Sequence, residues 1–402
     1  MGIFANPLTD LLEYEDFSRD FLKGTDPVGM TGCIDSEKVH FMSTFLGEKK
    51  VQLVVTYNEQ RAREIEEDYK LFCSQVYVIP PRDLIFFSAD LQGNAIIAER
   101  MKAFAALYQN EAKVIITTMD ALMSAAVPFE QLMSHVIKLK EGDELDLEKL
   151  KHDLTVMGYE RVGRVEEPGQ FTVHGGIADV YPLTMEVPVR IELWGDEIDT
   201  IRCFEPQSQR SMDQIECVSV FPAAEVIADD TARRRAVGMI QNELESQLAV
   251  FKKAKEPDKA KRLREETNRI LEALGEDVVL EAPDSYISYF YPRTVQLSEY
   301  FDEKNTLVFL DEPMRLKERG DGVQAEFEES MKNRLEQGFL LPGQTALLTP
   351  AKHVLAAFER GQVAALSSLD SRLADFTVVN SYAVNVQNMN TYREGFELLI
   401  KD

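Results

Sequence analysis

The feature that most constrains the fold is a regular alternation, within the first 127 residues, of short β-branched apolar runs and longer charged stretches. The runs VQLVVTY, QVYVIPP and KVIITTM predict buried strands over 51–57, 75–81 and 113–119, and helices are expected between them over 59–73 and 96–108. An order of strand, helix, strand, helix, strand is typical of a parallel sheet with helices on its faces. The sequence therefore predicts an α/β domain.

A second pattern begins near Pro128. Over 135–211 short strand-like runs are separated by turn residues, with one short helix expected over 147–157. These runs predict a small antiparallel β-rich domain inserted into the α/β unit. After about Asp213 helical patterns return, and the run TLVFLDEP (306–313) indicates a strand of the first domain resumed.

The domain prediction that follows has four segments. We expect a first part of the α/β domain, an inserted domain, a second part of the α/β domain and the start of a following α/β unit that ends in a helix over 388–402. The expected bounds of the four segments are 1–127, 128–212, 213–365 and 366–402.

The charge balance limits the classes of partner. The net charge is −25, and phosphate contacts need clustered Lys and Arg, so the chain as a whole is not expected to bind nucleic acid. The one basic stretch, Lys252–Arg269, holds eight Lys and Arg against four Asp and Glu. An exposed helix face and a DNA contact both remain open for it.

Cysteine usage and hydropathy indicate the compartment. Cys33, Cys73, Cys203 and Cys217 are scattered without CxxC spacing, which predicts reduced thiols and neither a disulfide framework nor a metal site. No apolar run approaches the roughly 18 residues that cross a bilayer, and the first residues do not form a signal peptide. We expect a cytoplasmic protein without a membrane partner.

The run VGMTGCIDS lies where a nucleotide-binding α/β domain carries its phosphate loop. In the pattern G-x-x-x-x-G-K-[ST], glycines let backbone N–H groups approach the phosphates and the lysine contacts the β/γ oxygens. Gly29 and Ser36 match this pattern, and Gly32 lies inside the loop. Ile34 stands at the second glycine and Asp35 at the lysine. The sequence predicts a degenerate nucleotide site.

Two further observations bear on this loop. Replacing the lysine with a carboxylate converts attraction into repulsion, each of roughly 4 kcal/mol for unit charges about 4 Å apart at an effective dielectric of about 20. Lys38 lies three positions too late to restore the site. Asp311 and Glu312, at the end of an apolar strand, stand where an acidic pair would bind Mg²⁺. A loop that never bound phosphate remains open, but the two landmarks together favour an NTPase domain that has lost its site.

The stretch PVRIELWG (188–195) contains the chain's only tryptophan. Alternate residues of a strand share a face, so Arg190 and Trp194 are predicted to point outward, away from the core. The run QFTVHG places Thr172 and His174 outward in the same way. Trp and Arg dominate protein–protein hot spots, which suggests an interaction surface, although Trp194 covering its own domain remains open, as does a structural hydrogen-bonding role for His174. No catalytic pair and no metal-binding set emerges.

At this point several runs are similar to a known family: FTVHGGIADVYPL, RIELWGDEIDTIRCFEPQSQRS, PPRDLIFFSAD, VNSYAVNVQNMNTYREGFELLIKD and the degenerate loop GMTGCIDS. They resemble the bacterial transcription-repair coupling factors (Mfd) over essentially the whole chain. The same region is similar to UvrB, whose phosphate loop is intact. The resemblance implies a helicase-like α/β domain with a degenerate phosphate loop and an inserted UvrB-like α+β domain.

The resemblance also implies a function. A full-length family member recognises RNA polymerase stalled at a lesion, displaces it with a C-terminal translocase that uses ATP and Mg²⁺ on DNA, and recruits UvrA. UvrA contacts in the family map onto His174, Arg190 and Trp194, where Arg190 matches, Trp194 keeps the aromatic character and His174 replaces an arginine. That replacement removes a fixed charge and a bidentate donor.

We therefore expect a fragment that recruits UvrA, has no cofactor and no catalytic activity of its own, and binds UvrA constitutively because the family's C-terminal domain, which covers this face, is absent. The alternatives are an active ATP-dependent DNA helicase or translocase and a UvrB-like binder of damaged DNA.

Overall fold

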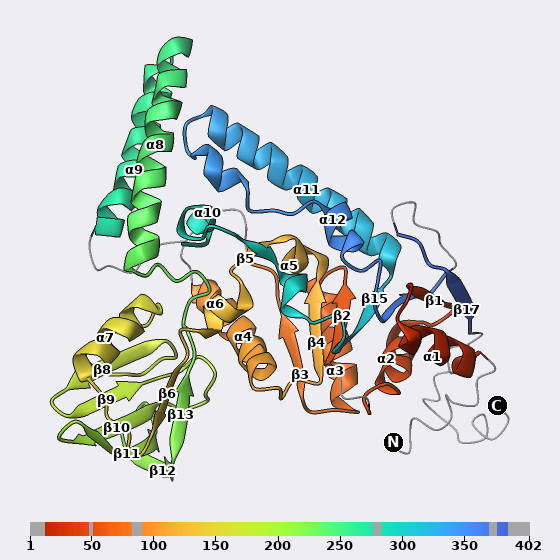
Figure 1. Ribbon diagram of the computed structural model, residues 1–402, viewed down its shortest axis with the longest axis horizontal. Coiled ribbons are helices and arrows are strands. Elements are labelled where there is room, and N and C mark those ends of the chain that lie inside the picture. The colour runs from red at the N-terminus through yellow and green to blue at the C-terminus, as the bar shows by residue number, and fades with distance from the viewer. Residues whose placement is uncertain (1–12, 48–50, 83–90, 276–282, 370–375, 385–402) are drawn as a thin grey trace, which may run out of the picture.

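The computed structural model describes residues 13–47, 51–82, 91–275, 283–369 and 376–384. Its centre is a parallel sheet of seven strands in the order β17-β1-β16-β15-β2-β4-β3, as shown in Figure 1. The strands are β1 (Val28–Thr31), β2 (Val51–Thr56), β3 (Val76–Ile79), β4 (Val114–Thr118), β15 (Thr306–Asp311), β16 (Val363–Ser367) and β17 (Asn380–Ala383). The predictions over 51–57, 75–81, 113–119 and 306–313 are confirmed, and so is the α/β class.

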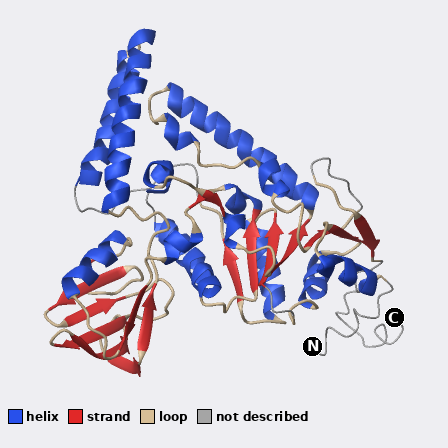
Figure 2. Cartoon of the chain, viewed as in Figure 1, coloured by secondary structure: helices blue, strands red, loops and turns tan. Residues whose placement is uncertain are grey.

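Helices cover both faces of this sheet, so two separate cores form (Figure 2). The apolar side chains of α1, α2 and α3 pack on one face, and those of α4, α5, α11 and α12 pack on the other. These helices are α1 (Tyr14–Lys23), α2 (Asp35–Ser43), α3 (Glu59–Lys70), α4 (Leu91–Tyr108), α5 (Met119–Met123), α11 (Pro313–Glu336) and α12 (Ala351–Ala356). Strand residues alternate between the two cores, with Val54 in one and Leu53 and Val55 in the other, as a sheet buried on both sides requires.

The inserted domain lies to one side of the main sheet (Figure 1). Its six-stranded sheet has the order β12-β11-β10-β9-β8-β7, with all neighbours antiparallel except β7 and β8, and a separate antiparallel pair joins β6 to β13. Helix α7 contributes Leu150 and Leu154 to the core of this domain. The elements are β6 (Ile137–Lys140), α7 (Leu147–Val156), β7 (Glu160–Arg161), β8 (Gln170–His174), β9 (Ile177–Val180), β10 (Val189–Trp194), β11 (Glu197–Phe204), β12 (Ser211–Ile215) and β13 (Cys217–Val220).

A long helical hairpin, α8 (Asp230–Ala254) and α9 (Pro257–Gly275), projects away from the sheet (Figure 1). The basic stretch Lys252–Arg269 spans the turn between the two helices and most of α9, and its apolar Leu263 is buried against the hairpin. The remaining elements are β5 (Ala125–Ala126), α6 (Phe129–Met133), α10 (Ile287–Phe290), β14 (Val295–Gln296) and the 3₁₀ turns η2 (Pro283–Tyr286), η3 (Leu297–Tyr300) and η4 (Pro342–Thr345).

Two predicted boundaries fall inside strands. The boundary at 212 lies within β12, and the antiparallel sheets of the inserted domain continue to Val220. The side chains of this edge strand are almost all exposed, so it lacks the apolar alternation that would have revealed it. The boundary at 366 lies within β16, and β16 and β17 both pair with β1, so both strands belong to the main sheet. The helix predicted over 388–402 and most of the run PPRDLIFFSAD lie outside the described residues.

A buried ion pair fixes the connector that leaves the inserted domain. Arg100 of α4 donates to Glu225 through Nη2 at 3.0 Å and to the Pro80 carbonyl through Nη1 at 2.6 Å. Burial raises the pKa of Glu225, but the charges of Arg100 and Arg82 outweigh that effect and leave it lowered. This carboxylate therefore stays ionised and holds the connector against the α/β domain.

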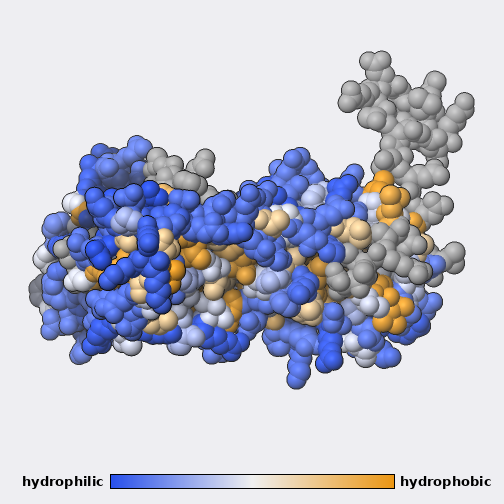
Figure 3. Space-filling view, turned by 90° about the horizontal axis from the view of Figure 1, so that it is seen from above, coloured by the Kyte–Doolittle hydropathy of each residue, from blue (hydrophilic) through white to orange (hydrophobic). Residues whose placement is uncertain are grey.

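The surface and the helices of the structure are examined next for apolar character. The face seen from above is mostly polar and shows apolar residues in separate patches (Figure 3). Within the described ranges no helix combines the length and apolar character needed to span a bilayer. Cys33, Cys73, Cys203 and Cys217 are free thiols in the structure.

Candidate functional site

The loop interpreted from the sequence as a degenerate phosphate loop connects β1 to α2. Two of its backbone N–H groups are engaged within the chain: Gly32 donates to the Ser367 carbonyl at 3.0 Å, and Ile34 donates to the Glu37 carboxylate at 3.4 Å. Gly32 has a φ of +86°, and a Cβ there would lie 1.9 Å from the Val384 carbonyl oxygen. The glycine is thus required by the chain that packs against it, and these amides are not free to bind phosphate.

The positions that replace the phosphate-binding residues open α2. Ile34 precedes the helix in an extended conformation, and Asp35 is its first residue, with a φ of +40° that is uncommon for a residue with a side chain. Arg61 of α3 donates through Nη2 to the Asp35 carbonyl at 3.0 Å. Ser36 follows on α2, so the residues of the loop pattern remain adjacent although their chemistry has changed.

Lys38, which the spacing excluded as a phosphate ligand, reaches the acidic pair instead. It is only 2% exposed, and its Nζ donates to Asp311 Oδ1 and to Glu312 Oε1, both at 2.7 Å. The ammonium group therefore lies between the two carboxylates where a divalent cation would be expected. Lys38 and Asp311 are 273 positions apart in the chain, so local spacing gave no signal for this contact.

Other donors complete the environment of the acidic pair. Asp311 Oδ2 accepts from the Thr56 hydroxyl at 2.9 Å and from Arg61 Nε at 3.4 Å, and Glu312 Oε1 accepts from the Ser368 backbone N–H at 2.8 Å. Burial raises the pKa of Glu312, but the hydrogen bonds from Lys38 and Ser368 outweigh it and leave the pKa lowered. Both oxygens of Asp311 and one oxygen of Glu312 thus accept hydrogen bonds from within the chain. The pair does not fit a nucleotide with its Mg²⁺, because the Lys38 ammonium lies where the metal ion would bind.

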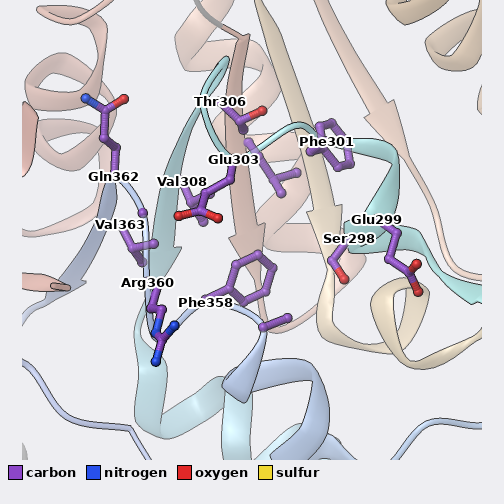
Figure 4. Close-up of a pocket in the computed structure, with 13 residues that line it drawn as sticks. Ser298, Glu299, Phe301, Glu303, Thr306, Val308, Phe358, Arg360, Gln362 and Val363 are labelled. Atoms are coloured by element: carbon purple, nitrogen blue, oxygen red, sulfur yellow. The ribbon is translucent and has the colours of Figure 1, made fainter. Parts of the chain in front are cut away.

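A small cavity lies at the other end of the main sheet's strands, where their amino ends are (Figure 4). It is lined by residues at the amino ends of β15 and β16, among them Thr306 and Val363, with Glu303 and Arg360 contributing charges. Parallel α/β sheets bind ligands beyond the carboxyl ends of their strands, where Asp311 lies. The cavity therefore has no connection with the degenerate site.

The inserted sheet presents the second candidate site. Val189 and Ile191 are fully buried and Leu193 packs on the domain core, whereas Trp194 is 85% exposed, so the predicted alternation along β10 is confirmed. Trp194 does not cover its own domain. His174 is also exposed, at the end of β8. The β8–β9 and β10–β11 turns lie at the same end of the sheet, which brings these two side chains to one edge.

Arg190 lies on this outer face but is not free. Its Nε and Nη2 donate to the two carboxylate oxygens of Asp179 on β9, at 2.8 and 2.7 Å. Its guanidinium stacks 4.7 Å from the centre of the buried Phe204 ring. Thr172, predicted to be outward, is on the same face but only 6% exposed. Alternation along the strand therefore predicts the face on which Arg190 lies. It does not predict the pairing of Arg190 with Asp179, which depends on strand register.

Strand register shows two residues that the pattern did not single out. Asp179, Arg190 and Arg202 stand directly opposite one another on β9, β10 and β11. Asp179 pairs with Arg190, and Arg202 extends the row. In the run IADV, Asp179 is the only charged residue of an otherwise apolar strand. This isolated carboxylate could have indicated that it pairs with a cation. Among the described residues no group of three or more His, Cys, Asp or Glu side chains could hold a metal ion.

Comparison with known proteins agrees with this architecture. Residues 137–225 match the family model described as the UvrB interaction domain. The chain is similar to the transcription-repair-coupling factor of Bacillus subtilis strain 168, with 30% identity over 342 residues that cover 84% of this chain and 29% of the relative. The corresponding protein of Staphylococcus epidermidis RP62A is 30% identical over 85% of this chain and 29% of its own length. The protein of Staphylococcus haemolyticus is 30% identical over 81% and 28%. The chain thus spans less than a third of each of these relatives.

Proposed function

The chain belongs with the UvrB-like regions of the transcription-repair coupling factors, and from this premise we propose that it recruits UvrA in transcription-coupled nucleotide excision repair. The inserted domain binds UvrA through the outer face of its six-stranded sheet. RNA polymerase and DNA are engaged by other parts of a full-length family member, which acts in the cytoplasm.

The exposure of Trp194 is the observation that carries this proposal. An indole that is 85% exposed, on a strand whose opposite face packs on the domain core, has no role in the core of its own domain. Tryptophan buries a large apolar area and provides one N–H donor, which makes it an effective anchor in protein interfaces. His174 at the same edge and Arg190 on the same strand supply polar groups around it.

Titration calorimetry of the chain with UvrA tests the proposal. We expect the wild type to bind and Trp194→Ala to weaken binding by at least about tenfold, as for a central aromatic anchor. Leu71→Ala is the matched control, because Leu71 is 77% exposed on the α/β domain and its truncation should leave the affinity unchanged. Absence of binding by the wild type, or equal affinity for Trp194→Ala, would overturn the proposal.

The proposal includes no catalysis at the degenerate site and no bound nucleotide. Its support is the contact of Lys38 with Asp311 and Glu312, together with the internal hydrogen bonds of the loop. Equilibrium binding of a fluorescent ATP analogue should therefore show no saturation at millimolar concentration. Micromolar affinity would instead favour an ATP-dependent helicase or translocase.

A further inference from the structure

One row of side chains crosses the outer face of the inserted sheet. Thr172 on β8, Asp179 on β9, Arg190 on β10, Arg202 on β11 and Gln214 on β12 are successive register partners. Directly opposite residues of antiparallel strands share a face and have Cβ atoms about 5 Å apart. The row therefore places two arginines side by side with a single carboxylate.

That carboxylate is committed to Arg190. Both oxygens of Asp179 accept hydrogen bonds from Arg190, and the side chain of Asp179 is only 8% exposed. The ring of Phe204 fixes the same guanidinium from a second direction. Asp179 and Arg190 thus form a neutral unit, and Arg190 contributes little free positive charge to a partner.

Arg202 has no such partner. Among the described residues no carboxylate forms an ion pair with it, and its Nε is buried without a hydrogen-bond acceptor. Gln214, its neighbour on β12, donates its amide to Glu141 at 2.8 Å instead. A buried N–H without an acceptor is destabilising relative to one that is hydrogen-bonded. Arg202 as a residue is only partly buried, so its guanidinium carries an uncompensated positive charge that an anion can approach from the outer face.

We propose that Arg202 receives a carboxylate side chain of UvrA, beside the neutral pair of Asp179 and Arg190. The inference rests on the proposed function, since it assigns a contact within the same interface. Trp194 lies on the same face, and four residues of a strand separate it from the row of Arg190 by about 13 Å. An acidic loop or helix of UvrA that packs against the indole can therefore reach Arg202.

The test compares three variants in titrations with UvrA at several salt concentrations. We expect Arg202→Gln to weaken binding about tenfold and to reduce its salt dependence, because a charge-assisted contact is lost. Arg202→Lys keeps the charge and should recover part of the affinity. Arg161→Gln removes the same charge from β7 at the other edge of the sheet and should bind as the wild type does.

The outcomes separate this inference from the proposed function. If Arg202→Gln binds like the wild type while Trp194→Ala does not, the assignment of Arg202 is wrong and the UvrA-binding face stands. If the wild type itself does not bind, the proposed function fails first. Circular dichroism establishes whether Arg202→Gln is folded. If it is unfolded, the folded Arg202→Lys variant decides, and an equal loss of its affinity at every salt concentration would overturn the inference.

Discussion

The degenerate nucleotide site and the outer face of the inserted sheet both carry arginines, lysines and carboxylates, yet they differ in where the partners of those groups come from. At the first site Lys38 and Arg61 meet Asp311 and Glu312 within the same domain. On the second face an indole and a guanidinium have no partner in the described chain. A site that is internally satisfied supports the fold, whereas one that is left open indicates an external partner.

The difference can be expressed in free energy. A buried charge that loses its partner destabilises a protein by several kcal/mol, whereas truncation of an exposed side chain changes stability by less than about 0.5 kcal/mol. Substitutions at the degenerate site should therefore act on unfolding and leave UvrA binding unchanged. Substitutions of the unpaired residues on the outer face, Trp194, Arg202 and His174, should act on binding and leave unfolding unchanged. A substitution at the first site that changed UvrA binding, or one of an unpaired residue on the outer face that changed the free energy of unfolding, would contradict this division.

Lys38→Met should have the largest effect. It removes a buried ammonium and leaves Asp311 and Glu312 without their shared cation, which should lower the free energy of unfolding by about 3–5 kcal/mol. Urea unfolding followed by circular dichroism measures this loss. Lys70→Met is the control, because the Lys70 side chain is 54% exposed in its pair with Glu66, and such a pair should contribute less than about 1 kcal/mol. Equal stability of the two variants would show that Lys38 is not a structural replacement for the lost cation.

Asp179→Asn should have a smaller, local effect on stability. Asparagine offers one acceptor oxygen in place of two charged ones, so Arg190 loses a charge-assisted hydrogen bond worth about 1.5–3 kcal/mol. Hydrogen exchange of the amides of β9 and β10 measures the loss within the inserted domain. Glu197→Gln, at the exposed β10–β11 turn, is the control and should exchange like the wild type. Unchanged protection in Asp179→Asn would mean that the pair does not stabilise the sheet.

The two sites also differ in how far the sequence could predict them. The strands β2, β3, β4 and β15 were predictable because parallel strands buried on both faces are continuous apolar runs. The outward position of Trp194 followed from alternation along one strand, which is a local property. The face of Arg190 followed in the same way.

What the sequence did not reveal depends on pairing between distant segments. The contact of Lys38 with Asp311 joins residues 273 positions apart, and the pair of Arg190 with Asp179 requires the register of β9 and β10. Strand β12 escaped notice because an exposed edge strand has no apolar period. Strand β17 was not predicted as part of the main sheet because the order of parallel strands is not encoded in local spacing.

Acid should destabilise the α/β domain through Glu312. Its pKa is lowered in the folded chain, so the unfolded chain binds this proton more readily, and the stabilisation is present above the unfolded pKa and is lost as pH falls through the folded pKa. Unfolding free energies of the wild type and Lys38→Met, measured between about pH 7 and the acid transition, should converge as Glu312 protonates. A constant difference between the two at all pH values would exclude this contribution.

His174→Arg should have the smallest effect and belongs wholly to the open face. His174 is exposed beside the β8–β9 turn, so the substitution should change the free energy of unfolding by less than about 0.5 kcal/mol. Arginine adds a permanent charge and a planar donor that can bind a carboxylate with two hydrogen bonds, so the affinity for UvrA should rise by about threefold. His152→Arg adds the same charge on exposed α7 and controls for net charge alone. If both variants gained affinity equally, the gain would reflect overall charge, and His174 would lie outside the interface that Trp194 defines.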